Sequence, residues 1–431
     1  MRYKVLVLII FSMISAQSIF NGYIGADSFS GSARSTAMGK THLLNSTGSN
    51  NVRFNPAMLP DRSNGVGIDF QVNRFSSFER WSMPVRDSFD EVLTQADYVS
   101  NEFSKFLVSA GATISFKLPL IGSIGVGFSY YPLTHFTYAY SEEVRGTYRP
   151  EDGEYGSKDP IVGYQNYNVN GTVFTSSVGV GTTLNILGDF KTSFGGSINL
   201  TKPFTINERV QVDSLYSNVT NLSVYPDVNN SYHVDSDMFV SVSAQVDLTA
   251  SSVVGFFYES ELQLKTKNYN VFIDSTNGLF QYWDSNVYTP LGLNYLKPQI
   301  IGFSYGNMSF DEQPLSISFE VDQVSYNNYL NFDDIYLWKF GFEYLTQLDT
   351  PVRGGIVYST SPVNSLPSST IFTFGSGKKI ENVVIDISGT YQLYTYKYPD
   401  LFVVENNIRP DYYDTIRDSQ LNLFLSVLYS F

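Results

Sequence analysis

The chain lacks cysteine entirely over its 431 residues. This absence excludes disulfide bonds, cysteine-ligated zinc or iron–sulfur sites, a thiol nucleophile and a lipid-anchored cysteine near the N-terminus. Histidine is scarce too, since His42, His135 and His233 are the only three. None of them lies in a recognisable catalytic motif. We therefore predict no metal centre, no cofactor and no enzymatic activity.

Charged residues make up only 16% of the chain, whereas a soluble domain has about 25%. The balance is acidic, with 27 Lys and Arg against 41 Asp and Glu. A nucleic-acid partner is excluded, because binding phosphates requires a basic face. Long apolar runs are also missing, and a spanning helix needs about 20 residues of them. The chain is instead rich in aromatic residues, with 33 Phe, 32 Tyr and 3 Trp.

The first 18 residues have the pattern of a secretory signal peptide. Arg2 and Lys4 precede an apolar run at residues 5–14, and small and polar residues follow at 15–18. This order of a charged region, a short apolar region and a cleavage region is typical of exported proteins. A buried N-terminal helix is the alternative, and cleavage after Ala16, Gln17 or Ser18 fits equally well. We predict a signal peptide at residues 1–18.

From residue 64 onward, apolar and polar residues alternate. Residues 315–322 and 421–431 are clear examples, with Leu, Ile, Phe, Val or Tyr at every second position. A period of two places the two sets on opposite faces of a β-strand. In a soluble sandwich the apolar face would pack on a second sheet, whereas in a membrane barrel it faces lipid.

The spacing of these segments favours the barrel. About 14 candidate strands can be counted, many of them about 10 residues long, as tilted membrane strands require. Short turns alternate with long polar connections, expected at residues 134–167, 205–237, 272–296 and 397–417. That layout, the aromatic surplus and an even strand number are typical of bacterial outer-membrane barrels. We predict an all-β transmembrane antiparallel β-barrel of about 14 strands over residues 64–431, located in the outer membrane and surrounded by its lipid.

The last residue, Phe431, follows alternating Leu and Tyr. It resembles the C-terminal signal that the barrel-assembly machinery reads, so that machinery is an expected partner during biogenesis.

Residues 19–63 do not alternate and are rich in Gly, Ser, Asn and Ala. They contain Gly-Ser-Ala-Arg-Ser-Thr-Ala-Met-Gly at 31–39 and Phe-Asn-Pro-Ala-Met-Leu-Pro at 54–60. Here the sequence resembles the FadL/TodX family of outer-membrane transporters for long-chain fatty acids and other hydrophobic compounds. The resemblance returns at residues 322–325, 338–344 and 352–363. It implies an N-terminal hatch, residues 19–63, inside a monomeric 14-stranded barrel that takes up hydrophobic small molecules passively.

The resemblance makes Asn55, Pro56 and Ala57 the constriction of the hatch, whose movement opens a path for ligand. Independently of it, Asn55 is biased away from the α region because a proline follows, and Pro56 has no N–H to donate. These properties predict a fixed kink that does not add to the sheet. An ordinary turn before the first strand is the alternative.

Four cations are candidates for binding a ligand head group. Arg353 and Lys339 fall on the inward faces of neighbouring strands by parity, near Glu343, Glu320 and Asp322. They could hold a carboxylate, but a structural ladder of ion pairs is the interpretation we favour. Arg34 and Arg53, in the hatch, are alternative anchors or ties between hatch and wall.

Gly125, Gly127 and Pro132 mark a candidate opening in the third strand, because glycine weakens a strand and proline removes a ladder hydrogen bond. In the FadL/TodX family a break in an early strand lets ligand leave sideways into the bilayer. A bend or a plain strand end is the alternative. Residues 88–106 have apolar residues at helical spacing behind Ser88, which predicts an amphipathic helix in the first outer loop.

Two functions follow from the sequence. The first is passive uptake of long-chain fatty acids or other hydrophobic small molecules through hatch movement and lateral release. The second is an adaptor role, because some 14-stranded relatives of the family are shuttles of type IX protein secretion and bind proteins at their outer loops.

Overall fold

The computed structural model describes residues 25–28, 31–60, 65–118, 122–145, 161–187, 190–215, 228–264, 272–274, 288–290, 295–307, 314–326, 333–361, 367–399, 401–402 and 413–431. The predicted signal peptide, residues 1–18, lies outside the described residues. So do the first part of the predicted hatch and the boundary between hatch and barrel near residue 64.

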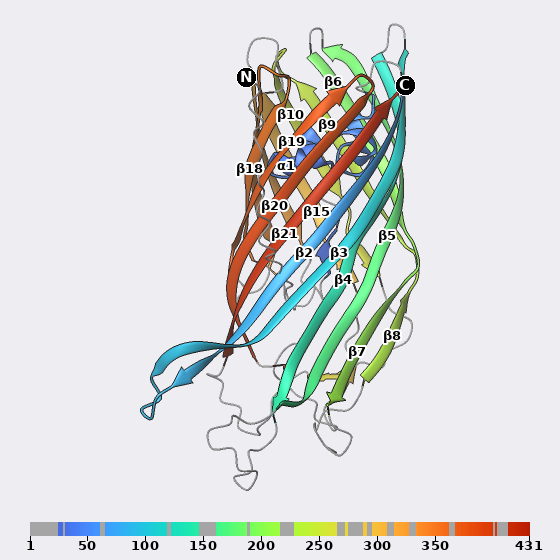
Figure 1. Ribbon diagram of the computed structural model, residues 1–431. Helices are drawn as coiled ribbons and strands as arrows, with labels where there is room; N and C mark the ends of the chain where they lie inside the picture. Colours follow the sequence, from blue (N-terminus) through green and yellow to red (C-terminus); the bar gives the residue numbers. More distant parts are fainter. Residues whose placement is uncertain are drawn as a thin grey trace.

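A closed antiparallel barrel of 14 strands forms the body of the protein (Figure 1). Strand β21 pairs with β2 along 16 residues and thereby closes the wall. The predicted fold class is confirmed. The barrel strands are β2 (Gly65–Arg86), β3 (Val92–Leu118), β4 (Gly122–Arg145), β5 (Ile161–Leu187), β6 (Phe190–Thr201), β9 (Met238–Asp247), β10 (Ser252–Glu259), β15 (Gln299–Asn307), β16 (Leu315–Ser325), β17 (Ile335–Leu345), β18 (Pro351–Ser359), β19 (Ser369–Ile380), β20 (Val383–Pro399) and β21 (Tyr413–Ser430).

The alternation in the sequence becomes an apolar outer face and a polar inner face. On β16, for instance, Ile317 and Phe319 are exposed, whereas Ser318 and Glu320 are buried. The same exposure of large apolar side chains recurs around the wall, as expected where a barrel faces lipid. Separately, none of the described helices is long and apolar enough to cross a membrane.

The predicted helix at residues 88–106 is wrong. The segment belongs to a hairpin in which β2 pairs with β3 from Gly65 to Arg86, beyond the end of the neighbouring strands. A turn at Asp87–Glu91 connects the two strands, and its end projects sideways from the barrel (Figure 1). The apolar residues there have helical spacing, but pairing with β2 gives the backbone groups hydrogen-bond partners, whereas an isolated short helix is only marginally stable in water.

Two of the predicted loops are largely strand. β4 continues to Arg145 and β5 begins at Ile161, so much of 134–167 is paired. Within 205–237, β7 (Phe204–Ser214) pairs with β8 (Val228–Val234) and with the outer part of β5. Shorter pieces are β11 (Leu262–Leu264), β12 (Phe272–Asp274), β13 (Tyr288–Pro290) and β14 (Tyr295–Lys297).

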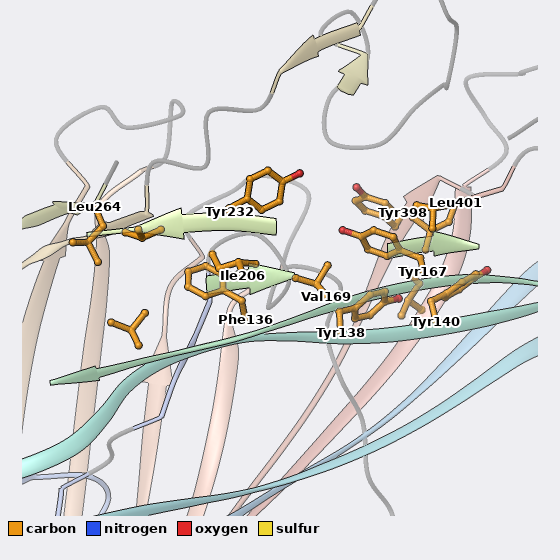
Figure 2. Close-up of a cluster of buried hydrophobic side chains, with 14 of the residues drawn as sticks. Phe136, Tyr138, Tyr140, Tyr167, Val169, Ile206, Tyr232, Leu264, Tyr398 and Leu401 are labelled. Carbon is orange, nitrogen blue, oxygen red and sulfur yellow. The ribbon is translucent and has the colours of Figure 1, made fainter. Parts of the chain in front are cut away.

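Side chains from these strand extensions fill the end of the barrel where β7 and β8 lie. They form one buried cluster, here called the aromatic core, that includes Phe136, Tyr138 and Tyr140 of β4 (Figure 2). Tyr167, Ile206, Tyr232 and Tyr398 join it from β5, β7, β8 and β20. The rings pack edge-on, stacked or tilted, with centroids 5.2 to 6.4 Å apart, within the range that aromatic pairs prefer. The aromatic core therefore closes over that end of the lumen.

The chain between residues 31 and 60 lies inside the other half of the barrel (Figure 1). It folds into one-turn pieces because glycine and proline interrupt every run. Ser32 caps the first of them by accepting a hydrogen bond from the Ser35 N–H at 3.2 Å. We call residues 31–60 the inner segment; its pieces are α1 (Ala33–Ala37), α2 (His42–Asn45), η2 (Gly48–Asn50), α3 (Asn51–Phe54) and η3 (Pro56–Met58).

Candidate functional site: the inner segment and the wall around it

Glycines on the inner face of the wall receive the inner segment. A Cβ at Gly181 or Gly195 would overlap the backbone of Pro56, and one at Gly341 would overlap that of Met38. Because glycine has no Cβ, the segment's backbone can lie directly against the strands. Glycines on seven strands, β3 to β6 and β17 to β19, take part, so we call them the glycine belt; its members are Gly111, Gly125, Gly127, Gly181, Gly195, Gly341, Gly355 and Gly375.

Gly125 and Gly127 belong to this belt and do not break their strand. β4 is paired there on both sides, with Gly125 opposite Ser115 of β3 and Gly181 of β5. A side chain at either glycine would meet Leu59 of the inner segment. The ladder is continuous at these two glycines of the candidate opening, and their small size allows contact with the inner segment.

The irregularity of β4 lies at Pro132. A register shift falls between Pro132 and Thr134 in the pairing with β5. The ladder between β3 and β4 ends at Ala110 and Tyr130, beyond which β3 pairs with β2 and β4 pairs with β5. Pro132, which has no N–H to donate, stands where the two strands part. We call this gap in the ladder the seam.

A short N-terminal strand adds to the edge of β4 at the seam. β1 (Ala26–Asp27) pairs with Thr134 and His135. The Ser28 N–H donates to the Leu133 carbonyl at 3.3 Å, and Thr134 Oγ1 donates to the Ala26 carbonyl at 2.8 Å. Residues that precede the inner segment therefore occupy part of the edge that β3 leaves.

Asn55, Pro56 and Ala57 lie together against the wall, and Asn55 is fully buried. Asn55 lies outside the α region (φ −154°, ψ 74°), and Pro56 opens a 3-10 turn. The Asn55 side chain donates to the Leu43 carbonyl and to Gln245 Oε1 of β9, the latter at 3.2 Å. The Ala57 N–H donates to Ser243 Oγ at 2.9 Å. The motif thus links two parts of the inner segment to one wall strand.

Arg34 and Arg353 meet at one carboxylate. Arg34 donates to Glu343 at 2.8 Å, and Arg353 binds the other oxygen of Glu343 and also Asp386, at 2.6 Å. Glu343 and Arg353 are direct cross-strand neighbours on β17 and β18. This row of ion pairs therefore runs along the inner face from β17 to β20 and is joined by Arg34 of α1 in the inner segment.

Lys339 is the centre of a second buried cluster. Its ammonium contacts Glu320 at 2.6 Å and Asp322 on the next strand. Glu320 also accepts the Leu43 N–H at 2.9 Å. A small cavity beside the cluster is lined by His42, Phe54 and Phe257 in addition. Lys339, like Arg353, is thus held by wall carboxylates.

Arg53 binds a carboxylate that sequence reasoning did not single out. Its guanidinium donates two hydrogen bonds to Glu259, at 3.0 and 3.1 Å, and Lys297 contacts the same carboxylate at 2.9 Å. All three side chains are almost fully buried. Bidentate geometry and burial make this the most enclosed tie between inner segment and wall.

No model of a protein family matches the chain, and neither does any curated protein. Among solved structures, the P. putida toluene transporter TodX is similar, with a TM-score of 0.58 at 13% identity over 93% of this chain and 98% of that one. A Pseudomonas aeruginosa FadL homologue gives a TM-score of 0.56 at 13% identity, over 95% and 99%. The chain has the fold of the FadL/TodX barrels. The resemblance seen in the sequence is confirmed at the level of fold.

Glu79 and Glu208 are among the carboxylates buried in the part of this FadL/TodX-type barrel that extends beyond the apolar outer band. Glu79 accepts hydrogen bonds from Tyr138 at 2.9 Å, Tyr396 at 3.2 Å and Asn101 at 3.3 Å. Glu208 likewise accepts from Tyr167 and Tyr232. Removal from water raises the pKa of Glu79 to about 7 and raises the pKa of Glu208 as well.

The stability of the protein should therefore fall as the pH rises through the range in which Glu79 titrates. In the unfolded chain the carboxyl ionises near pH 4.5, whereas the native pKa is about 7. The native state thus binds the proton more tightly, and this contribution is lost between those two values. Melting temperatures measured from pH 4 to 8 should show a decline in the wild type that is smaller in Glu79→Gln. Equal slopes in the two proteins would contradict the assignment.

Proposed function

We propose that the protein is a channel of the bacterial outer membrane for passive uptake of hydrophobic small molecules. The observation that carries this proposal is a lumen occupied by a fitted inner segment, next to a wall whose ladder parts at the seam. Such a barrel does not serve as an open aqueous pore. In this proposal residues 1–18 direct export, residues 19–63 form the hatch, and residues 64–431 form the barrel.

The two structural neighbours support the class of ligand. One is a toluene transporter and the other a FadL homologue. For this chain we infer uptake of long-chain fatty acids or other hydrophobic compounds, which enter past the aromatic core. Apolar and aromatic lining with few polar groups is what such ligands require. The absence of a recognisable catalytic motif in the sequence agrees with a role that is not enzymatic.

In the proposed mechanism the hatch moves and the ligand leaves sideways. Asn55, Pro56 and Ala57 form the constriction, because they hold two parts of the hatch against β9. The exit is the seam beyond Pro132, where neither β3 nor β4 has the other as its ladder partner. A wall without ladder hydrogen bonds opens at lower energetic cost than a paired one.

Asn55→Ala should alter transport while the barrel stays folded. The change removes the side-chain bonds to Leu43 and Gln245, and each buried bond that is lost costs about 1 kcal/mol or more. Uptake of radiolabelled oleate by cells should differ from the wild type, with unchanged circular dichroism. Pro56→Ala should change uptake as well, because alanine does not fix the kink as proline does. Normal uptake in both variants would contradict the role of the motif.

Native mass spectrometry of the detergent-extracted protein tests the proposal directly. A bound adduct of fatty-acid or hydrocarbon mass, displaced by added oleate, is the expected result. A co-purified protein without any such adduct would instead favour the adaptor of type IX secretion.

One feature favours that second function. The turn of the β2–β3 hairpin presents Phe89, which is 86% exposed, on a backbone fixed by two hydrogen bonds to Asp87 Oδ1. Met83 and Leu93 beside it are exposed as well. An ordered apolar tip of this kind is a candidate contact for another protein.

A further inference from the structure

Lys105 extends from the inner face of β3 across the seam. Its ammonium donates to Thr137 Oγ1 of β4 at 3.1 Å and to Asn170 Oδ1 of β5 at 3.2 Å. Thr137 and Asn170 are cross-strand neighbours, and their side chains lie on the face opposite the aromatic core. The ammonium therefore sits between the edge of β3 and the β4–β5 pair.

The partners of Lys105 set it apart from the cations around the hatch. Arg34, Arg53, Lys297, Lys339 and Arg353 each contact at least one carboxylate. Both acceptors of Lys105 are uncharged, and in the described part of the chain no carboxylate pairs with it. A half-buried ammonium whose charge is not neutralised attracts an anion.

His135 supplies a second donor at the same place. Its side chain is fully buried, and Nδ1 lies 3.3 Å from Thr137 Oγ1, the oxygen that also accepts from Lys105. If that hydroxyl uses its proton to bond Nδ1, the imidazole proton lies on Nε2. Within the described residues, Nε2 has no hydrogen-bond partner. A buried N–H without an acceptor is costly, and a ligand oxygen would relieve this cost.

We propose that Lys105 and His135 form a binding site for the carboxylate of an amphipathic ligand at the seam. This inference rests on the proposed transport function and assigns the residues that would hold the head group of an acidic ligand. The ammonium would attract the carboxylate by its charge, and the imidazole N–H would fix the orientation of the carboxylate by a hydrogen bond. Around the hatch, by contrast, wall carboxylates already occupy the cations and repel a second anion.

The position also suits the tail of such a ligand. Phe106 and Val108, next to Lys105 on β3, point outward and are exposed. A molecule whose head is held by Lys105 would therefore have its apolar tail beside the surface that faces lipid. Binding at the seam orients the ligand for release in that direction.

The test compares two ligands that differ only in the head group, oleate and oleyl alcohol, on the full-length protein in detergent and in proteoliposomes. Loss of one charge-assisted hydrogen bond weakens binding about tenfold or more. Lys105→Gln should weaken oleate binding by that factor and leave oleyl alcohol unchanged. Lys105→Arg should retain most of the oleate affinity, since it keeps the charge. His135→Phe should weaken oleate to a smaller extent.

Lys378→Gln is the matched control, because the Lys378 side chain is exposed near the end of β19 and donates to the Leu348 carbonyl; both ligands should bind it as they bind the wild type. Equal loss of both ligands in Lys105→Gln, or no loss of oleate, would overturn the carboxylate site. If the wild-type protein binds oleyl alcohol but does not bind oleate, the carboxylate site is overturned while the transport function stands. Binding of neither ligand would overturn both.

Discussion

Gly195→Ala should open the channel while the barrel remains folded. The added methyl group would overlap the backbone of Pro56 and Ala57, which cannot move aside without displacing the whole turn. Overpacking of this kind costs about 1–3 kcal/mol, and 1.4 kcal/mol is a factor of ten in an equilibrium. The ratio of displaced to seated inner segment should therefore rise about tenfold. Conductance in planar lipid bilayers should rise accordingly.

The neighbouring residue provides the control. A Cβ at Gly196 would come no closer than 3.7 Å to any atom, which is an ordinary van der Waals distance. Gly196→Ala changes the same strand with the same substitution and should leave the conductance low. If Gly195→Ala and Gly196→Ala conduct alike, the glycine belt does not hold the hatch.

Among the ion pairs that join the inner segment to the wall, the one at Glu259 should be the most sensitive to loss of its charge. Glu259→Gln should therefore lower the stability of the protein strongly. It removes the negative charge that both Arg53 and Lys297 contact, and leaves two buried cations without it. Breaking a buried ion pair by removing one partner costs about 3–5 kcal/mol. Thermal unfolding in detergent should begin at a lower temperature. Limited proteolysis should also cut the segment around Arg53 sooner than in the wild type.

Asp97→Asn is the comparison for this experiment. Asp97 pairs with Arg80 on the hairpin at 3.5 Å, and their side chains are 41% and 50% exposed, respectively. Surface pairs of this kind contribute about 0–1 kcal/mol, so its unfolding temperature should stay close to that of the wild type. A Glu259→Gln protein that is equally stable would show that relaxation or water compensates the two cations.

The barrel was predictable because each strand carries its own signal. Alternation at residues 315–322 and 421–431 reports which face is apolar, without reference to any partner. The helix expected at 88–106 failed for the complementary reason. Its apolar residues have helical spacing, but the segment pairs with the neighbouring 22-residue strand β2, and no local pattern reports that long-range pairing.

The candidate site was harder to predict from the sequence than the fold. Parity placed Arg353 and Lys339 on the inner wall, where the structure has them, and suggested their carboxylate neighbours. It gave no sign of Glu259, whose cationic partners come from α3 and β14, far away in sequence. Lys105 escaped notice because its acceptors, Thr137 and Asn170, are neutral and belong to strands that meet it only across the seam. The glycines of the belt likewise look like ordinary strand glycines until the segment they receive is known.

The seat of the hatch also constrains the order in which the protein can assemble. The Gly39 N–H donates to Thr373 Oγ1, a partner 334 residues later in the chain, and Arg34 binds Glu343, 309 residues later. The inner segment, which precedes these strands in the chain, therefore finds its final contacts only when strands near the C-terminus are in place. Contacts between such distant residues form slowly, because a long loop must be closed first. Late docking of this kind means that a barrel interrupted before β17 would lack three of the eight glycines of the belt, together with Glu343 and Thr373.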